Sequence, residues 1–168
     1  MDIKLNSKLF LNVKGSYYDT FTDNSGPLPP KVGEKTTYVI NWSLINVSNK
    51  IVDGKVQSTL PPGVKFTDKK NPENSNLTFN ERTNSIVWDV GNLDAGTGIL
   101  TSPEELSFQV ELIPAPNQVG DYANILEQSI ITGKDLFSGK DLSFTVKEKN
   151  TFLAEDKKIK EDEYKVAE

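Results

Sequence analysis

The sequence predicts an all-β fold, built as an antiparallel sandwich of two sheets with about seven to nine short strands. Three observations support this prediction: apolar residues recur at every second position in several segments, proline- and glycine-rich turns separate those segments, and residues 1–153 contain no convincing helix. A period of two is typical of a strand that buries one face, because successive side chains point to opposite sides.

The central strand is predicted at residues 36–46, where the alternation is strongest. Its large apolar side chains share one face and mostly polar ones share the other: Tyr38, Ile40, Trp42 and Leu44 on the first, and Thr37, Asn41 and Ser43, with Val39 and Ile45, on the second. Trp42 and Trp88 are the best candidates for a ring cluster between the sheets, because each can bury a large apolar area. Both are predicted to be core residues rather than sugar-stacking residues.

The other predicted strands follow the chain in order. They are residues 8–18, 51–60, 64–66, 77–80, 85–91, 105–113 and 122–132, and a last strand marked by Leu142, Phe144 and Val146. Short turns predict two antiparallel hairpins, one from the central strand to 51–60 and one joining 77–80 to 85–91. Loops are predicted at 19–30, 68–76 and 133–139, where turn-forming residues cluster.

The chain changes character after residue 153. Residues 154–168 are mostly charged and helix-permissive, and Ile159, Tyr164 and Val166 do not form a continuous apolar stripe. We therefore predict a sandwich domain at 1–153, followed by a charged tail at 154–168 that is a frayed helix or a linker. A partner-binding helix is the alternative for this segment.

Composition excludes several classes of function. The net charge of -5 and the pI near 4.9 argue against a nucleic-acid binder, which needs a basic face. The chain has neither cysteine nor histidine, which removes disulfides, thiol and imidazole catalysis, and zinc sites with these ligands. No apolar run is long enough to span a membrane. Residues 1–5 lack a signal-peptide core, so we expect a cytosolic protein or an internal piece of a longer exported chain.

Carboxylates and amides are the remaining candidate site residues. The oxygens of Asp19, Asp23 and Asn24 are able to gather a calcium ion, but their spacing differs from that of the EF-hand loop, and turn formation is the favoured role. A pair of carboxylates for glycoside hydrolysis is formally possible, and the spacing identifies no such pair. We therefore predict no catalytic residue, no metal site and no cofactor.

Four blocks of sequence resemble a known family. Residues 33–38, 60–66, 88–96 and 108–110 look like the recurring blocks of the conserved-repeat, immunoglobulin-like domains of prokaryotic surface proteins, in order and in spacing. The resemblance covers roughly residues 33–112. It implies an immunoglobulin-like sandwich that acts as a structural or adhesive module in a large exported protein, without catalytic residues. This chain has one copy rather than a tandem array.

The resemblance leaves three hypotheses. The first is a non-catalytic spacer in an extracellular or cell-surface assembly, whose partners are neighbouring domains or subunits. The second is an adhesive module that binds a glycan or protein through loops at one end, around 19–30, 68–76 and 92–103. The third is a carboxylate-based hydrolase. Related surface sandwiches also contain a lysine-to-asparagine isopeptide bond, for which Lys14 and Asn150 are the candidate pair, although exposed, solvated side chains are the expected state.

Overall fold

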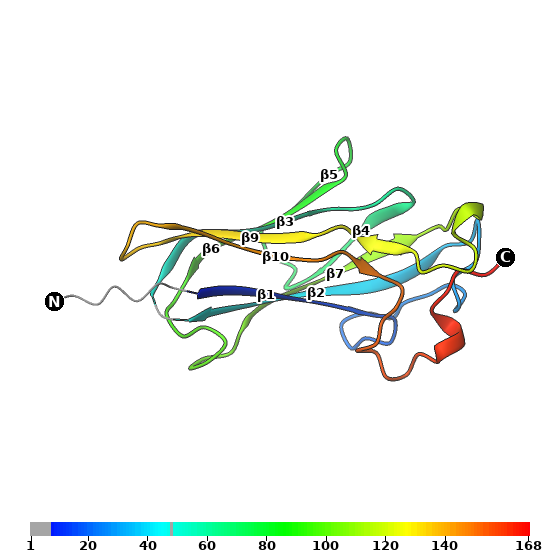
Figure 1. Cartoon of the computed structure of the whole chain (residues 1–168), viewed down its shortest axis with the longest axis horizontal. Helices are drawn as coiled ribbons and strands as arrows, with labels where there is room; N and C mark the ends of the chain where they lie inside the picture. The colour runs from blue at the N-terminus through cyan, green and yellow to red at the C-terminus, as the bar shows by residue number, and fades with distance from the viewer. Residues whose placement is uncertain (1–7, 48) are drawn as a thin grey trace.

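The computed structural model describes residues 8–47 and 49–168, and in them two antiparallel sheets pack face to face (Figure 1). The four-stranded sheet has the order β1 (Lys8–Ser16), β2 (Thr36–Val47), β7 (Glu104–Leu112) and β4 (Val64–Asn71). The five-stranded sheet has the order β10 (Asp141–Val146), β9 (Ser129–Asp135), β3 (Ile51–Thr59), β6 (Ser85–Leu93) and β5 (Leu77–Asn80). The predicted antiparallel sandwich is confirmed.

Short elements complete the chain. Strands β8 (Asn124–Leu126) and β11 (Lys149–Asn150) pair with each other, which brings the described strands to eleven. Two short 3₁₀ helices, η1 (Pro116–Gln118) and η2 (Glu161–Glu163), are the helical elements of the described residues. The count exceeds our seven to nine because very short strands leave no periodic signal. Residues 1–7 and 48 lie outside the described residues, so the structure does not test our expectation about residues 1–5.

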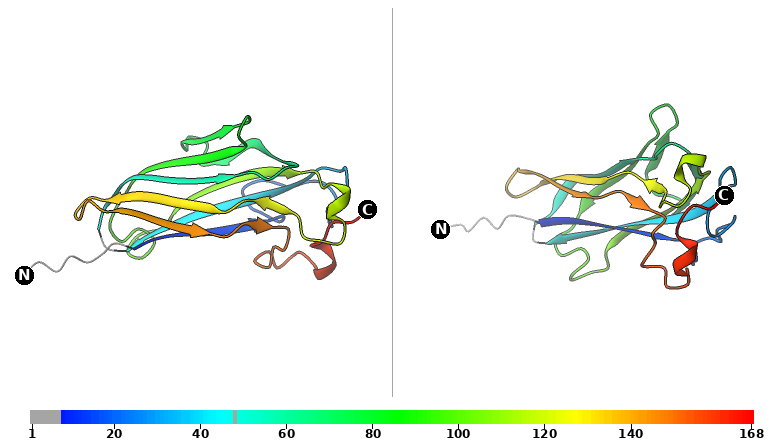
Figure 2. Two further views of the ribbon diagram at one scale, coloured as in Figure 1. Left: turned by 45° about the horizontal axis from the view of Figure 1, so that its top comes forward. Right: turned by 45° about the vertical axis from the view of Figure 1, so that its right-hand side comes forward.

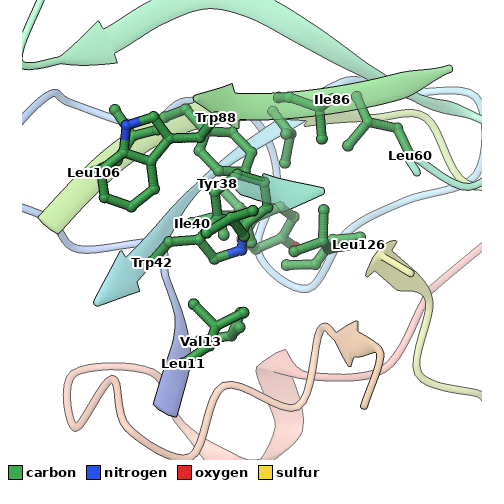
Figure 3. Close-up of a cluster of buried hydrophobic side chains, with 14 of the residues drawn as sticks. Leu11, Val13, Tyr38, Ile40, Trp42, Leu60, Ile86, Trp88, Leu106 and Leu126 are labelled. Atoms are coloured by element: carbon green, nitrogen blue, oxygen red, sulfur yellow. The ribbon is translucent and has the colours of Figure 1, made fainter. Parts of the chain in front are cut away.

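The core follows the alternation of β2. Tyr38, Ile40, Trp42 and Leu44 are all buried, as predicted. Trp42 from β2 and Trp88 from β6 project between the sheets (Figure 3). The Trp42 ring meets Phe108 edge to face, with centroids 4.8 Å apart. Both tryptophans are therefore core residues, because each is covered by side chains from both sheets.

The predicted hairpin between the central strand and residues 51–60 is wrong. Strand β2 pairs with β1 and β7, whereas β3 pairs with β6 and β9 in the other sheet. The connection from Val47 to Ile51 therefore crosses between sheets. The buried Asn46 side chain holds this crossing, since its amide nitrogen donates to the carbonyl oxygens of Asn49, Leu93 and Asp94. The second predicted hairpin, β5 with β6, is confirmed.

Two loop boundaries also differ from the prediction. Strand β4 runs on to Asn71, into the expected loop at 68–76, because it continues beside β7 after an irregular step between Phe66 and Lys70. The expected run at 122–132 is split into β8 and β9, and β9 continues to Asp135. The break lies beside the Ser58 hydroxyl, which is 2.9 Å and 3.0 Å from the carbonyl oxygens of Glu127 and Gln128.

The C-terminal segment packs against the sandwich. Asp156, Ile159 and Val166 are buried, and η2 is the segment's one helical turn. This differs from the expected frayed helix or solvated linker. These residues are irregularly spaced, and Asp156 and Val166 bond to different loops, so no periodic stripe is needed to hold the segment in place.

The sandwich is elongated, and the ends of the described chain lie far apart. Strand β1 begins at one end of the long axis, and the C-terminus lies at the other (Figures 1 and 2). Aromatic contacts close the two long sides: Phe10 meets Phe144 at 5.3 Å between β1 and β10, and Phe66 meets Phe79 at 6.0 Å between β4 and β5. Among the described residues, no helix has the length and apolar character needed to cross a membrane.

Candidate functional site

A polar groove of about 720 Å³ lies on the outer face of the four-stranded sheet. Its floor includes Asn41 and Ser107, and the Asn41 amide nitrogen donates to the Ser107 hydroxyl oxygen at 3.0 Å. One wall is the loop that follows β1, and the other is the C-terminal segment near residues 155–158. The groove offers amide, hydroxyl, carboxylate and ammonium groups, which suit hydrogen bonding and ion pairing.

Gln109 fixes the loop at 19–30 over this face. Its side chain is buried although it points away from the core, because the loop covers it. The amide nitrogen of Gln109 donates to Asn24 Oδ1 at 2.9 Å, and the Thr67 hydroxyl donates to Gln109 Oε1 at 3.0 Å. The Ser25 N–H adds a bond to the Thr37 hydroxyl oxygen at 2.8 Å. Local sequence does not indicate this role, since Gln109 looks like any outward residue of a strand.

Asp19 and Asn24, two of the three residues considered for calcium, act as turn formers. Asp19 accepts from the Ser16 hydroxyl at 2.6 Å and from the Phe21 N–H at 2.8 Å, so both carboxylate oxygens are engaged. The Asn24 amide nitrogen donates to the Tyr17 carbonyl oxygen at 2.7 Å. These are the contacts of the favoured turn-forming role. In the part of the chain that the structure describes, no three acidic side chains are placed to hold a metal ion.

Asp156 joins the C-terminal wall to the loop after β1. Its Oδ2 accepts from the backbone N–H groups of Tyr17 and Tyr18, both at 2.8 Å, and its Oδ1 accepts from the Lys158 N–H at 3.2 Å. The Lys158 ammonium lies 5.8 Å from the centroid of the Tyr18 ring. The role of Asp156 is not visible in the sequence, because one carboxylate in a charged run has no local signal that separates it from its neighbours.

The candidate isopeptide pair is not brought together in a buried site. Lys14 is exposed on the outer face of β1 and lines the groove, whereas the core face of this strand consists of Leu9, Leu11 and Val13. Asn150 lies on β11, and its side-chain oxygen accepts from the Phe152 N–H at 2.9 Å. This agrees with the solvated state that we expected for the lysine.

The three loops expected to share one end of the sandwich do not. Residues 19–30 and 68–76 approach each other at Phe21, which lines both the groove and an adjoining hollow of about 490 Å³. The loop at 92–103 lies at the opposite end, beside the end of β2, where the Asn46 N–H donates to the Thr97 carbonyl oxygen. Most of the length of β2 separates the loop at 92–103 from the loops at 19–30 and 68–76. The three loops therefore do not form one surface.

Tyr17, which follows β1, and Tyr38, a core residue of β2, are neighbours. Tyr17 and Tyr38 have ring centroids 6.1 Å apart, and the Tyr17 hydroxyl donates to the Gly26 carbonyl oxygen at 3.0 Å. Burial raises the pKa of the Tyr38 hydroxyl well above its ordinary value of 10, and burial followed by the neighbouring Tyr18 raises the pKa of Tyr17. Both phenols therefore stay protonated at neutral pH and act as packing groups.

Comparison with known proteins supports the fold. No protein-family model matches the chain, and no curated protein matches it. A variant of BcpA, the major pilin subunit of Bacillus cereus, is similar in structure with a TM-score of 0.52 and 13% identity, over 86% of this chain and 40% of the pilin. The chain is an immunoglobulin-like β-sandwich. It spans less than half the length of this pilin, and identity this low shows the fold alone.

Other similar structures are more distant. The full-length major pilin SpaD of Corynebacterium diphtheriae has a TM-score of 0.43 and 12% identity, over 83% of this chain and 34% of the pilin. A GH20 exo-β-N-acetylglucosaminidase variant of Vibrio harveyi also has a TM-score of 0.43, with 8% identity, over 83% of this chain and 17% of the enzyme. Scores below 0.5 do not establish a shared fold, so neither a pilin nor an enzyme role follows from them.

Proposed function

We propose that this chain is a non-catalytic structural module that spaces and stiffens an extracellular or cell-surface assembly. The observation that carries the proposal is the position of the chain ends. Lys8 begins β1 at one end of the long axis, and Glu168 lies at the other (Figure 2). A neighbouring domain joined at either end therefore continues the line of the sandwich. The fold that the chain shares with a bacterial major pilin supports the same role.

Exposed apolar side chains at the two ends support contacts with neighbouring domains or subunits. Leu100 is 83% exposed at one end, where Ile99, Leu136 and Phe137 are also exposed. Near the C-terminus, Tyr122 and Phe152 are exposed and their rings are 5.3 Å apart. Large apolar side chains on a surface commonly mark interaction sites when they cluster.

The test joins two full-length copies in one chain and measures the particle by small-angle X-ray scattering. A spacer predicts a maximum dimension close to double that of one copy. A tandem as compact as two domains packed side by side would overturn the proposal. A matched tandem with Leu100→Ser and Phe137→Ser in the second copy reports on the end contacts, and we expect it to bend more than a tandem with Thr145→Ser.

Three of the four carboxylates that line the groove, those of Asp19, Glu155 and Asp156, support this role over hydrolysis. Asp19 and Asp156 accept hydrogen bonds on both of their oxygens. Glu155 forms an ion pair with Lys149 at 2.5 Å. These three acids stabilise turns and contacts between chain segments, which is a structural role.

Adhesion through the groove is the second candidate. It is favoured by the meeting of two expected recognition loops at Phe21, where a polar floor adjoins a second hollow. The test is a glycan array probed with the full chain and with an Asn41→Ala, Ser107→Ala double variant, using Thr132→Ala on the other sheet as control. A saturable signal lost only in the double variant supports adhesion, and no signal from folded protein rejects it for those glycans.

A further inference from the structure

The first strand and the C-terminal segment are tied together by one buried carboxylate. Strand β1 runs along the long axis and ends at Ser16, and the next two N–H groups, of Tyr17 and Tyr18, both donate to Asp156 Oδ2 at 2.8 Å. Asp156 is only 7% exposed. Hydrogen bonds to a charged, largely buried acceptor are stronger than those between neutral groups. The contact therefore links segments nearly the whole chain apart in sequence.

A second attachment holds the last residues on both sides. The Val166 N–H donates to the Asp121 carbonyl oxygen at 3.0 Å, and the Gly120 N–H donates to the Val166 carbonyl oxygen at 2.9 Å. On the other side, the Ala167 N–H donates to the Pro30 carbonyl oxygen at 2.8 Å. Residues 166–167 thus form a short bridge between two loops, and the Val166 side chain is buried.

These two attachments determine how a force applied at Glu168 is transmitted to the domain. The bridge at 166–167 meets the pull first. Once it opens, the segment back to Asp156 is held by few bonds, among them that of the Thr151 hydroxyl to the Tyr164 carbonyl oxygen at 2.6 Å. Beyond Asp156 lie the buried Leu153 and Thr151, and the Thr151 N–H donates to the Ala123 carbonyl oxygen at 2.9 Å. After them come β11, which pairs with β8 at only two positions, and β10, an edge strand paired only with β9. Edge pairings are peeled one bond at a time.

We propose that Asp156 is a mechanical stop that passes tension from the C-terminal segment directly into β1. Strand β1 is paired with β2 over its whole length, from Lys8 with Val47 to Ser16 with Val39. Tension applied at both chain ends then acts along β1. It loads all the backbone hydrogen bonds between β1 and β2 at the same time, and β10 stays paired with β9. The inference rests on the proposed structural role, because it assumes that the assembly pulls on the module along its long axis.

The test is single-molecule force spectroscopy on the full chain held between marker domains at both ends. In the natural chain we expect the first extension to stop at Asp156, releasing residues 157–168, on the order of 4 nm of chain. In Asp156→Ala we expect the first extension to pass residue 156 at lower force and, because Leu153 and Thr151 then bear the load without β1, to continue through β10, releasing residues 141–168, roughly 10 nm. Asp162→Ala, an exposed acid of the same segment, is the matched control and should match the natural chain.

Two results would overturn the stop: a first extension unchanged in Asp156→Ala, or the same change in Asp162→Ala. Circular dichroism and a cooperative melt check that each variant is folded. If Asp156→Ala does not fold, Asp156→Asn, which keeps one acceptor oxygen, takes its place. We expect its first extension at an intermediate force. A force equal to that of the natural chain would count against the stop. A compact tandem in the scattering experiment would reject the spacer role and leave the stop standing.

Discussion

The indole N–H of Trp42 donates a hydrogen bond to the Ser129 hydroxyl oxygen at 3.2 Å, and this contact joins the two sheets through the core. Trp42 lies on β2 and Ser129 on β9, and both are fully buried. A tryptophan in a dry core needs an acceptor for its one polar group. The serine meets that need from the opposite sheet, so the pair also fixes how the sheets face each other.

Replacing that serine should destabilise the domain. We expect Ser129→Ala to lower the free energy of unfolding by about 1–3 kcal/mol, because the buried indole N–H loses its acceptor. Urea denaturation followed by tryptophan fluorescence measures the change. Ser143→Ala on the exposed face of β10 is the control and should stay within about 0.5 kcal/mol of the natural chain. Equal effects of the two substitutions would contradict the assigned bond.

Removing the Tyr38 hydroxyl should not destabilise the domain. This oxygen is buried and has no hydrogen-bond partner among the described residues. Tyr38→Phe therefore removes an unsatisfied polar atom, and we expect the free energy of unfolding to stay the same or rise by about 1 kcal/mol. Tyr17→Phe is the matched comparison, because it deletes the bond to Gly26 and should cost about 1 kcal/mol. The opposite order in chemical denaturation would show that Tyr38 has a partner.

Stability should fall in alkali through Tyr38. Burial raises its pKa in the folded chain above the ordinary value of 10. Above that ordinary value the unfolded state releases the phenol proton while the folded state keeps it, so fewer protons are bound on unfolding and the free energy of unfolding decreases as pH rises. The stabilisation is complete below pH 10, and its loss approaches about 1.4 kcal/mol per pH unit above it. Tyr38→Phe should have a shallower slope, and an unchanged slope would assign the loss elsewhere.

Gln109 should control the order of the loop beside the groove. Gln109→Ala removes the bonds to Asn24 and Thr67, so we expect faster amide hydrogen exchange in residues 20–30 and a loss of about 1–3 kcal/mol in unfolding free energy. Hydrogen exchange read by mass spectrometry resolves the loop from the core. Gln128→Ala, an exposed glutamine on the other side of the molecule, is the control. Unchanged exchange at 20–30 would show that the loop is held by other contacts.

Local alternation was enough to assign the faces of the strands. Tyr38, Ile40, Trp42 and Leu44 point into the core as their spacing predicts, because neighbouring strand residues must face opposite ways. Turn chemistry also located the β5–β6 hairpin. It failed for β2 and β3, since a short polar connection has the same composition whether the chain returns to one sheet or crosses to the other.

The groove and the mechanical stop depend on contacts between distant residues. Asn41 and Ser107 meet because β2 and β7 are neighbours, and Asp156 reaches Tyr17 only when the C-terminal segment folds back over β1. The sequence by itself determined the all-β class, the buried faces and the absence of thiol and imidazole chemistry, because these depend on residue type and short-range spacing. The tertiary structure alone decided strand partners, the packing of residues 154–168 and the position of each loop, because these depend on which apolar faces bury one another and which distant backbone groups are left to pair.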